Sequence, residues 1–210
     1  MRLICSLFTV HLKRWAKLFI GLASVGIGVA FTKQANLGLG PWDVLGDGLA
    51  QLTGIQLGTA SIVIGAVVML LWIPMREKPG VGTLTNLLLI GVVMNVALVV
   101  IRSAGGFLMQ GIWLIAGLLL IGAGSVYYLA SQLGAGPRDG LMLGLSRKTG
   151  WSVRLTRTTL EVAVLVAGWF LGGAVGVGTV VIALAIGPII QLMSRMTGEE
   201  LINRPDQLSN

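Results

Sequence analysis

The polar residues best suited to chemistry lie in a motif that the sequence contains twice. The motif LGxGPxD reads LGLGPWD over residues 37–43 and LGAGPRD over residues 133–139. Its proline suits the first turn of a helix, and its aspartate then lies near the free N–H groups of that turn. Glycine backbone at a helix N-terminus can bind a polar group, so we expect each copy to contact a solute. The candidate substrate-binding residues of the two copies are Gly38, Gly40, Pro41, Asp43, Gly134, Gly136, Pro137 and Asp139.

The same motif also suits a purely structural role. Its glycines allow a tight turn, and its aspartates can act as ordinary helix caps. The segment between each motif and a following Thr-Gly pair, at 53–54 and 149–150, is too short to cross a hydrocarbon core of about 30 Å. Each segment is therefore either a half-helix that enters the protein or a helix that braces the membrane interface.

A second repeated motif, GVGT, occupies residues 80–83 and 176–179. Its glycines permit close approach of helices, and a threonine hydroxyl can bond within its own helix or to a neighbour. Thr83 and Thr179 are therefore further candidates for contact with a solute. Close helix packing is the alternative role of both motifs.

A single carboxylate, Glu161, lies within the apolar run 154–172. A carboxylate in a bilayer is costly unless it faces the interior of the bundle or a water-filled cavity. Arg157 precedes it by one helical turn, so the two side chains can form an ion pair. We expect Glu161 and Arg157 to couple proton movement to solute movement, to stabilise the helix as a pair, or to do both.

Other kinds of chemistry lack the residues they need. Cys5 and His11 are the sole cysteine and histidine, which is too few ligands for a zinc site. Nucleophilic catalysis needs a positioned base, and no phosphate-binding GxxxxGK[ST] motif occurs. We therefore expect no enzymatic activity, no cofactor and no metal.

Composition identifies the chain as an integral membrane protein. Apolar residues make up 55% of its 210 residues and charged residues 11%, against about 25% charged in soluble domains. The net charge of +7 would suggest nucleic-acid binding in a soluble protein, but here the basic residues lie between apolar runs. We expect the lipid bilayer as partner and no nucleic acid. The apolar runs cover residues 15–34, 57–74, 82–101, 109–130, 154–172 and 178–194.

The positions of the basic residues predict the topology. Lysine and arginine remain on the cytoplasmic side of membrane proteins. If all six runs cross the membrane and both termini are cytoplasmic, every basic residue except Lys33 and Arg102 lies inside. Five crossings would place one of the basic clusters outside. The six-span topology is therefore favoured.

The chain contains an internal repeat. LGxGPxD and GVGT each recur after 96 residues, as do Thr53-Gly54 and several glycines of the first run. Three spans in each copy require the copies to be inverted relative to one another. The predicted fold is an all-α six-span bundle of two inverted three-helix repeats, each with a short extra half-helix or interfacial helix. We expect one membrane domain over 1–210, with repeats at 14–95 and 110–191 and a short cytoplasmic tail at 197–210.

Together these motifs resemble a known family. LGLGPWDVL, the later GPRDG and a GVGT in each half are similar to the YczE/YitT-like small bacterial integral membrane proteins. The resemblance covers roughly residues 15–195 and implies a location in the bacterial inner membrane. It carries no catalytic residue over to this chain.

Inverted repeats are common in secondary transporters, whose sites lie near the repeat interface. We therefore expect a small-solute secondary transporter or permease that works by alternating access. The alternative is a membrane scaffold or accessory subunit that binds a partner membrane protein. Association of the chain with a second copy of itself is compatible with either function.

Overall fold

A computed structural model describes residues 2–198, with side chains placed from residue 12 onward. Every regular element in these residues is a helix, which confirms the all-helical prediction. Most of the expected tail over 197–210 lies outside the described residues. The elements are α1 (Arg2–Gln34), α2 (Pro41–Thr53), α3 (Leu57–Leu70), the short 3-10 helix η1 (Ile73–Met75), α4 (Val81–Val100), α5 (Phe107–Ala130), α6 (Pro137–Thr149), α7 (Val153–Phe170) and α8 (Val177–Thr197).

Several of these helices are long and apolar enough to cross a bilayer. Within the described part of the chain they are Leu12–Gln34, Leu57–Met75, Val81–Val100, Phe107–Ala130 and Val177–Thr197. The predicted run 154–172 forms α7, which is absent from this set of five. Its sequence contains Arg154, Arg157 and Glu161, which lower its hydropathy.

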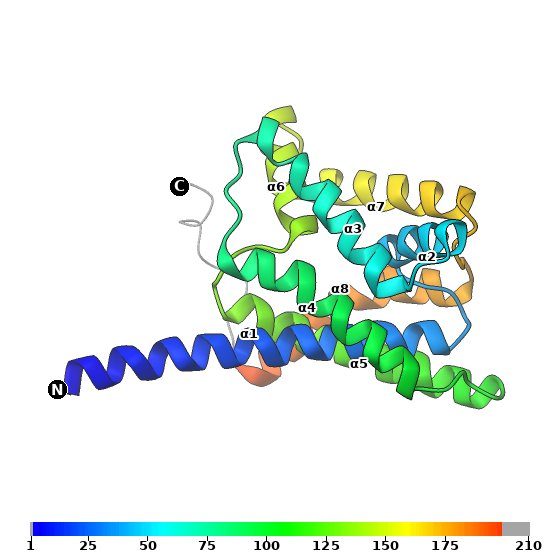
Figure 1. The fold of residues 1–210 in the computed structure, drawn as a ribbon, viewed down its shortest axis with the longest axis horizontal. Coiled ribbons are helices and arrows are strands. Elements are labelled where there is room, and N and C mark those ends of the chain that lie inside the picture. The colour runs from blue at the N-terminus through cyan, green and yellow to red at the C-terminus, as the bar shows by residue number, and fades with distance from the viewer. Residues whose placement is uncertain (1, 199–210) are drawn as a thin grey trace.

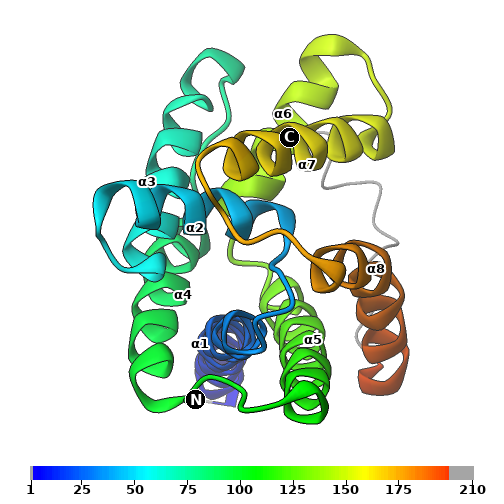
Figure 2. The ribbon, with the colours of Figure 1, turned by 90° about the vertical axis from the view of Figure 1, so that its right-hand side faces the viewer.

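Helices α1 and α5 lie along one another, with α4 beside α1 and α8 beside α5 (Figures 1 and 2). Glycines allow the central pair to pack closely. A Cβ on Gly28 would lie 2.8 Å from the carbonyl oxygen of Gly117, and a Cβ on Gly21 would lie 2.6 Å from that of Gly124. The remaining helices, α2, α3, α6 and α7, lie together on one side of this layer (Figure 2).

The helix boundaries recur at the spacing of the sequence motifs. α2 and α6 begin at Pro41 and Pro137, each with proline in its first turn. Both helices end at a left-handed glycine, Gly54 with φ 75° and Gly150 with φ 74°. Glycine is favoured there because other residues rarely adopt this conformation. The first residues of α3 and α7, and of α4 and α8, are likewise 96 residues apart.

Hydrogen bonds between the two halves recur at the same spacing. The Gly82 N–H at the start of α4 donates to the carbonyl oxygen of Leu133 at 2.8 Å. The Gly178 N–H at the start of α8 donates to the carbonyl oxygen of Leu37 at 2.7 Å. Each GVGT motif therefore holds the loop that precedes the short helix of the other half.

The two halves differ in how their helices pack. α3 packs along α4, whereas α7 makes almost no contact with α8 (Figure 2). α2 and α7 meet closely at Gly168, where a Cβ would lie 2.5 Å from the backbone nitrogen of Leu45. At the corresponding place between α3 and α6, the buried indole of Trp72 lies against Gly140. The α2–α7 contact is therefore backbone against backbone, whereas α3 and α6 are separated by an indole ring.

Candidate functional site

A cavity of about 420 Å³ lies between the two halves, and each of the eight α-helices contributes residues to its lining. Its walls are mostly aliphatic, which leaves a small number of polar groups to contact a ligand. This composition is typical of sites for small molecules. The polar or charged lining residues are Asp43, Ser61, Asn86, Ser125, Tyr128, Arg138, Asp139, Arg157 and Glu161.

The structure brings most of the predicted site residues together at this cavity. The lining includes Gly40, Pro41, Asp43, Gly136, Pro137, Asp139, Arg157 and Glu161. Gly38, Gly134, Thr83 and Thr179 are not among the lining residues. They lie where the two halves join instead.

The two threonines connect each short helix to the opposite half. Thr83 Oγ1 donates to the carbonyl oxygen of Ala135 at 2.7 Å, and the Thr83 side chain is buried. Thr179 is also buried, and a Cβ on Gly38 would lie 2.6 Å from its Oγ1. Gly38 and Gly134 have φ angles of 107° and 132°, which other residues rarely adopt. In this conformation these four residues support the site without contacting the cavity.

An ion pair crosses the cavity from one half to the other. Arg138 Nη2 at the start of α6 lies 3.3 Å from Asp43 Oδ1 at the start of α2. The Arg138 guanidinium carbon also lies 5.3 Å from the centre of a Trp42 ring, within the range of cation–π attraction. Trp42 and Arg138 occupy equivalent positions in the two LGxGPxD motifs.

Asp139, the aspartate of the second LGxGPxD motif, has a different environment from Asp43. The Tyr128 hydroxyl donates to Asp139 Oδ2 at 3.3 Å and accepts from the Gly136 N–H. Burial raises the pKa of the Asp139 carboxyl, and the Tyr128 hydroxyl, Arg157 and Arg138 offset part of that effect. Helix α6, which carries Asp139, is not one of the five candidate membrane helices. Asp139 therefore takes up a proton more readily than an exposed aspartate.

The predicted ion pair between Arg157 and Glu161 on α7 is present. Arg157 Nε donates to Glu161 Oε1 at 2.9 Å, as the spacing of four residues suggested. The Glu161 side chain is 31% exposed and that of Arg157 is 53% exposed. Both residues line the cavity, so this pair also contributes charge to the site.

Several residues that line the cavity lie outside both sequence motifs and were not predicted. Tyr128 lies in an apolar run and belongs to neither motif, and Ser61 is one of many small residues in α3. The buried Ser61 Oγ is without a hydrogen-bond partner within the described residues. The sequence did distinguish Arg138, because it is the residue at which the second LGxGPxD motif differs in charge from the first. No group of three histidine, cysteine or acidic residues suited to a metal occurs in the described part of the chain.

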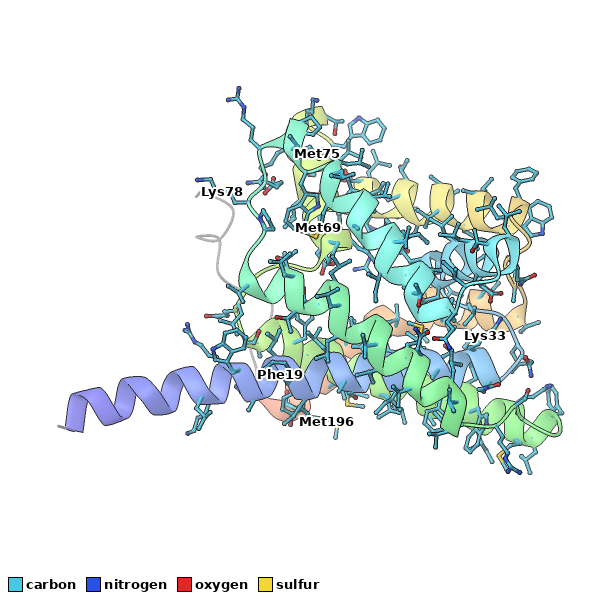
Figure 3. The ribbon with its side chains drawn as sticks, viewed as in Figure 1. Phe19, Lys33, Met69, Met75, Lys78 and Met196 are labelled. Carbon is cyan, nitrogen blue, oxygen red and sulfur yellow. The ribbon has the colours of Figure 1, made fainter. Side chains whose placement is uncertain are left out.

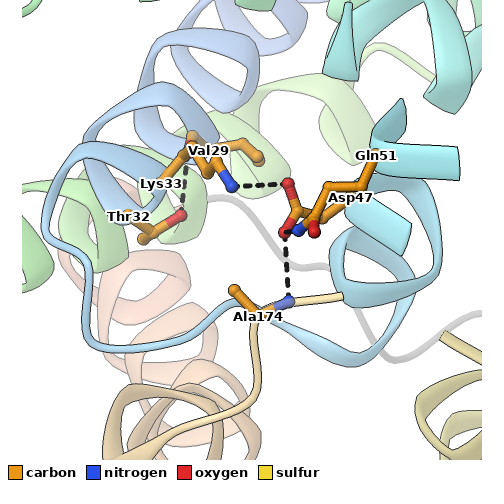
Figure 4. A network of polar contacts seen from close by, with 6 residues as sticks. All are labelled: Val29, Thr32, Lys33, Asp47, Gln51 and Ala174. Atoms are coloured by element: carbon orange, nitrogen blue, oxygen red, sulfur yellow. Dashed lines mark hydrogen bonds and ion pairs between the residues drawn. The ribbon is translucent and has the colours of Figure 1, made fainter. Parts of the chain in front are cut away.

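A separate polar network lies at the end of the molecule that holds α2 (Figure 4). Asp47 is 2% exposed and pairs with the Lys33 ammonium. Its other oxygen accepts from Gln51 Nε2 at 2.9 Å and from the Ala174 N–H at 3.0 Å. These bonds connect α1, α2 and the loop between α7 and α8.

The opposite end of the molecule carries a simpler contact. Arg147 of α6 pairs with Glu77 in the loop between η1 and α4. The Arg147 side chain is 47% exposed, so water competes with this ion pair. Each short helix is thus joined to the connecting loop of the other half, through a buried network at one end and an exposed ion pair at the other.

Comparison with known proteins places this architecture in a family. The model of the family of unknown function DUF6198 matches residues 12–195. An uncharacterized protein of Haemophilus influenzae is 37% identical over 186 residues, which is 89% of this chain and 85% of that protein. The uncharacterized membrane protein YczE of Bacillus subtilis is 36% identical over 180 residues, covering 85% of this chain and 84% of YczE.

A more distant relative, the uncharacterized protein YyaS of Bacillus subtilis, is 24% identical over 189 residues, or 88% of this chain and 94% of YyaS. No solved structure is significantly similar to the chain. The family match and the two nearer relatives confirm the resemblance seen in the motifs. The chain is a membrane protein with several apolar helices and belongs to the YczE-like DUF6198 family.

Proposed function

We propose that this protein is a secondary transporter or permease for a small solute. The observation that carries the proposal is the charged cavity between two halves whose boundaries recur after 96 residues. Ionisable groups at membrane depth are costly and mark solute or ion pathways. Sites near the interface of two repeats are a recurrent feature of transporters.

The course of the helices supports six crossings by two inverted repeats. Following the colours in Figure 1, α1, α4 and α7 run in one direction, and α3, α5 and α8 run in the other. Of the three charged residues of α7, Arg157 and Glu161 line the cavity, where α7 can span the membrane with these two directed away from lipid. Arg154 lies in the first turn of the helix.

Charge supports an orientation in the bacterial inner membrane. Lys33 lies at the end that holds α2, and Lys78 lies at the opposite end (Figure 3). By the distribution of basic residues, the end with Lys78, α6 and the start of α1 faces the cytoplasm. The closely packed α2 end would then face outside, and we infer that this conformation is closed to the outside.

We expect cysteines at equivalent positions on the two short helices to react from opposite faces of the membrane. Thr53 and Thr149 are suited to this test because both are exposed and each donates to a carbonyl oxygen of its own helix. Thr149 Oγ1 also accepts from the Trp151 N–H just beyond that helix. In a Cys5→Ser background, Thr53→Cys should react with an impermeant maleimide added outside intact cells. Thr149→Cys should react only after the cytoplasmic side is made accessible. Labelling of both from one face would contradict the inverted arrangement.

Purified protein in liposomes should transport solute in a saturable and pH-dependent manner. Tyr128, Arg138 and Arg157 surround the Asp139 carboxyl, whose pKa is raised. As the pH falls, the Asp139 carboxylate is therefore protonated at a higher pH than an exposed aspartate would be. We expect Asp139→Asn to abolish the pH dependence of flux that lies above the ordinary titration range of an aspartate.

The acids Asp43 and Glu161 line the same cavity and serve as comparison sites. Because the pKa of Asp139 is raised, we expect Asp139→Asn to alter the pH dependence more than the matched substitution Glu161→Gln does. A flux whose pH profile is unchanged in Asp139→Asn would exclude this carboxyl as the proton site. No flux for any cationic, neutral or anionic solute would instead favour the scaffold function.

A further inference from the structure

The cavity holds a cation-binding arrangement that a side chain of the protein already occupies. The Arg138 guanidinium lies 5.3 Å from a Trp42 ring centre and 3.3 Å from Asp43 Oδ1. An aromatic face and a carboxylate together are the usual means of recognising an organic cation. Trp42 and Asp43 come from one half of the molecule, whereas Arg138 comes from the other.

The acceptor in this arrangement is largely buried, whereas the donor is exposed and makes a single long contact. The Asp43 side chain is 12% exposed, and that of Arg138 is 42% exposed. The ion pair has a single contact at 3.3 Å, whereas strong arginine–carboxylate pairs are shorter and bidentate. Arg138 can therefore leave at the loss of one long hydrogen bond, while Trp42 remains packed against the cluster of Val68, Trp72 and Leu141.

Departure of Arg138 would leave an excess of negative charge in the cavity. Arg157 is already paired with Glu161 at 2.9 Å. Asp43 would then lack a basic partner among the described contacts, and Asp139 would retain only the nearby charge of Arg157. A ligand with one positive charge restores the balance that Arg138 provides in this conformation.

The remaining walls suggest the rest of the ligand. Ile90 on α4 and Ile182, Ile186 and Ile190 on α8 provide apolar surface. The buried Ser61 Oγ, which also lines the cavity, is unpartnered among the described residues. An apolar group attached to the cation would be in contact with these isoleucines, and a polar atom on it could bond to Ser61.

We propose that Trp42 and Asp43 recognise an organic monocation with an apolar substituent, and that Arg138 occupies this site until the ligand displaces it. This inference rests on the proposed transport function, whose solute class it names. Arg138 then acts as an internal competitor: it neutralises Asp43 in the empty cavity and is exchanged for the solute.

The test uses benzylguanidinium as probe, with benzylurea as a neutral analogue of similar shape and benzoate as an anion. Titration calorimetry on the full chain in detergent should show saturable binding of benzylguanidinium, and at least about tenfold weaker binding of the other two. Asp43→Asn and Trp42→Leu should each weaken the binding of benzylguanidinium by about tenfold or more. Equal binding of benzylurea would overturn the proposal, and so would preferential binding of benzoate.

The decisive variant is Arg138→Gln, which removes an exposed side chain and should leave the fold intact. Loss of the competitor should tighten the binding of benzylguanidinium several-fold. Lys148→Gln, an exposed basic residue on the same helix and outside the cavity lining, should leave binding unchanged. If Arg138→Gln weakens binding, Arg138 contacts the ligand and the proposed competition is wrong.

The inference and the proposed function can fail separately. Binding of benzylguanidinium without flux in liposomes would support the cation site and contradict transport. Saturable flux of a neutral or anionic solute, without binding of benzylguanidinium, would support transport and contradict the cation site.

Discussion

Replacement of Gly117 by valine is expected to prevent the chain from reaching its folded state. A Cβ at this position would lie 2.7 Å from the carbonyl oxygen of Gly28 and 3.1 Å from the backbone nitrogen of Thr32. These are backbone atoms of α1, which cannot move away without separating α1 from α5. Overpacking of an interior costs about 1–3 kcal/mol or more, and here the displaced contact joins the two central helices.

The yield of monodisperse protein after extraction in detergent provides the measurement, together with the midpoint of thermal unfolding. Gly21→Val should behave like Gly117→Val, since a Cβ on Gly21 would lie 2.5 Å from the backbone nitrogen of Tyr128. Gly111→Val on α5 is the matched control, because no atom lies within 4 Å of a Cβ there. Normal folding of Gly117→Val would mean that α1 and α5 do not cross at this glycine.

Local sequence signals predicted the helices and several of their contacts. The prolines at 41 and 137 and the glycines at 54 and 150 fixed the ends of α2 and α6, because their backbone preferences act within one turn. The pairing of Arg157 with Glu161 followed from their spacing of four residues. These features depend on neighbours in the chain, so one sequence suffices to find them.

Contacts between the halves could not be predicted in the same way. The pairing of Arg138 with Asp43 and Trp42 requires the two short helices to start at the same cavity. The repeat indicated that they are related, but it gave no distance between them. Even within the second half, the Tyr128 hydroxyl on α5 bonds to Asp139 on α6, and the repeat equivalent of Tyr128, Thr32, is not an aromatic residue. The repeat therefore did not indicate that an aromatic hydroxyl would line the cavity.

The difference between the two ends follows from an exchange of large and small residues. At the α2–α7 contact, Val44 faces Gly168, and the helices approach to backbone contact. At the α6–α3 contact the equivalent residues are Gly140 and Trp72, and the Trp72 indole also donates to the Pro137 carbonyl oxygen at 3.1 Å. These exchanges make the contacts at the two ends of the molecule different, although the helix boundaries recur.

The buried network around Asp47 should hold the α2 end closed, and Asp47→Ala should therefore open it. Removal of this carboxylate leaves the Lys33 ammonium and the Ala174 N–H without their partner at a nearly buried site. Loss of a partner from a buried pair costs about 3–5 kcal/mol. Lys33 is 30% exposed, so water compensates for part of the loss and we expect about 2 kcal/mol.

Position 39 is suited to detecting this opening, because Leu39 is 1% exposed and its N–H donates to the carbonyl oxygen of Ala174. In a Cys5→Ser background, Leu39→Cys should react slowly with an impermeant maleimide added outside. Asp47→Ala should raise that rate by about tenfold or more, since about 1.4 kcal/mol changes an equilibrium tenfold. Glu77→Ala, which removes the exposed pair at the other end, should leave the rate unchanged. If the two substitutions accelerate labelling equally, the Asp47 network is not a specific closure of the α2 end.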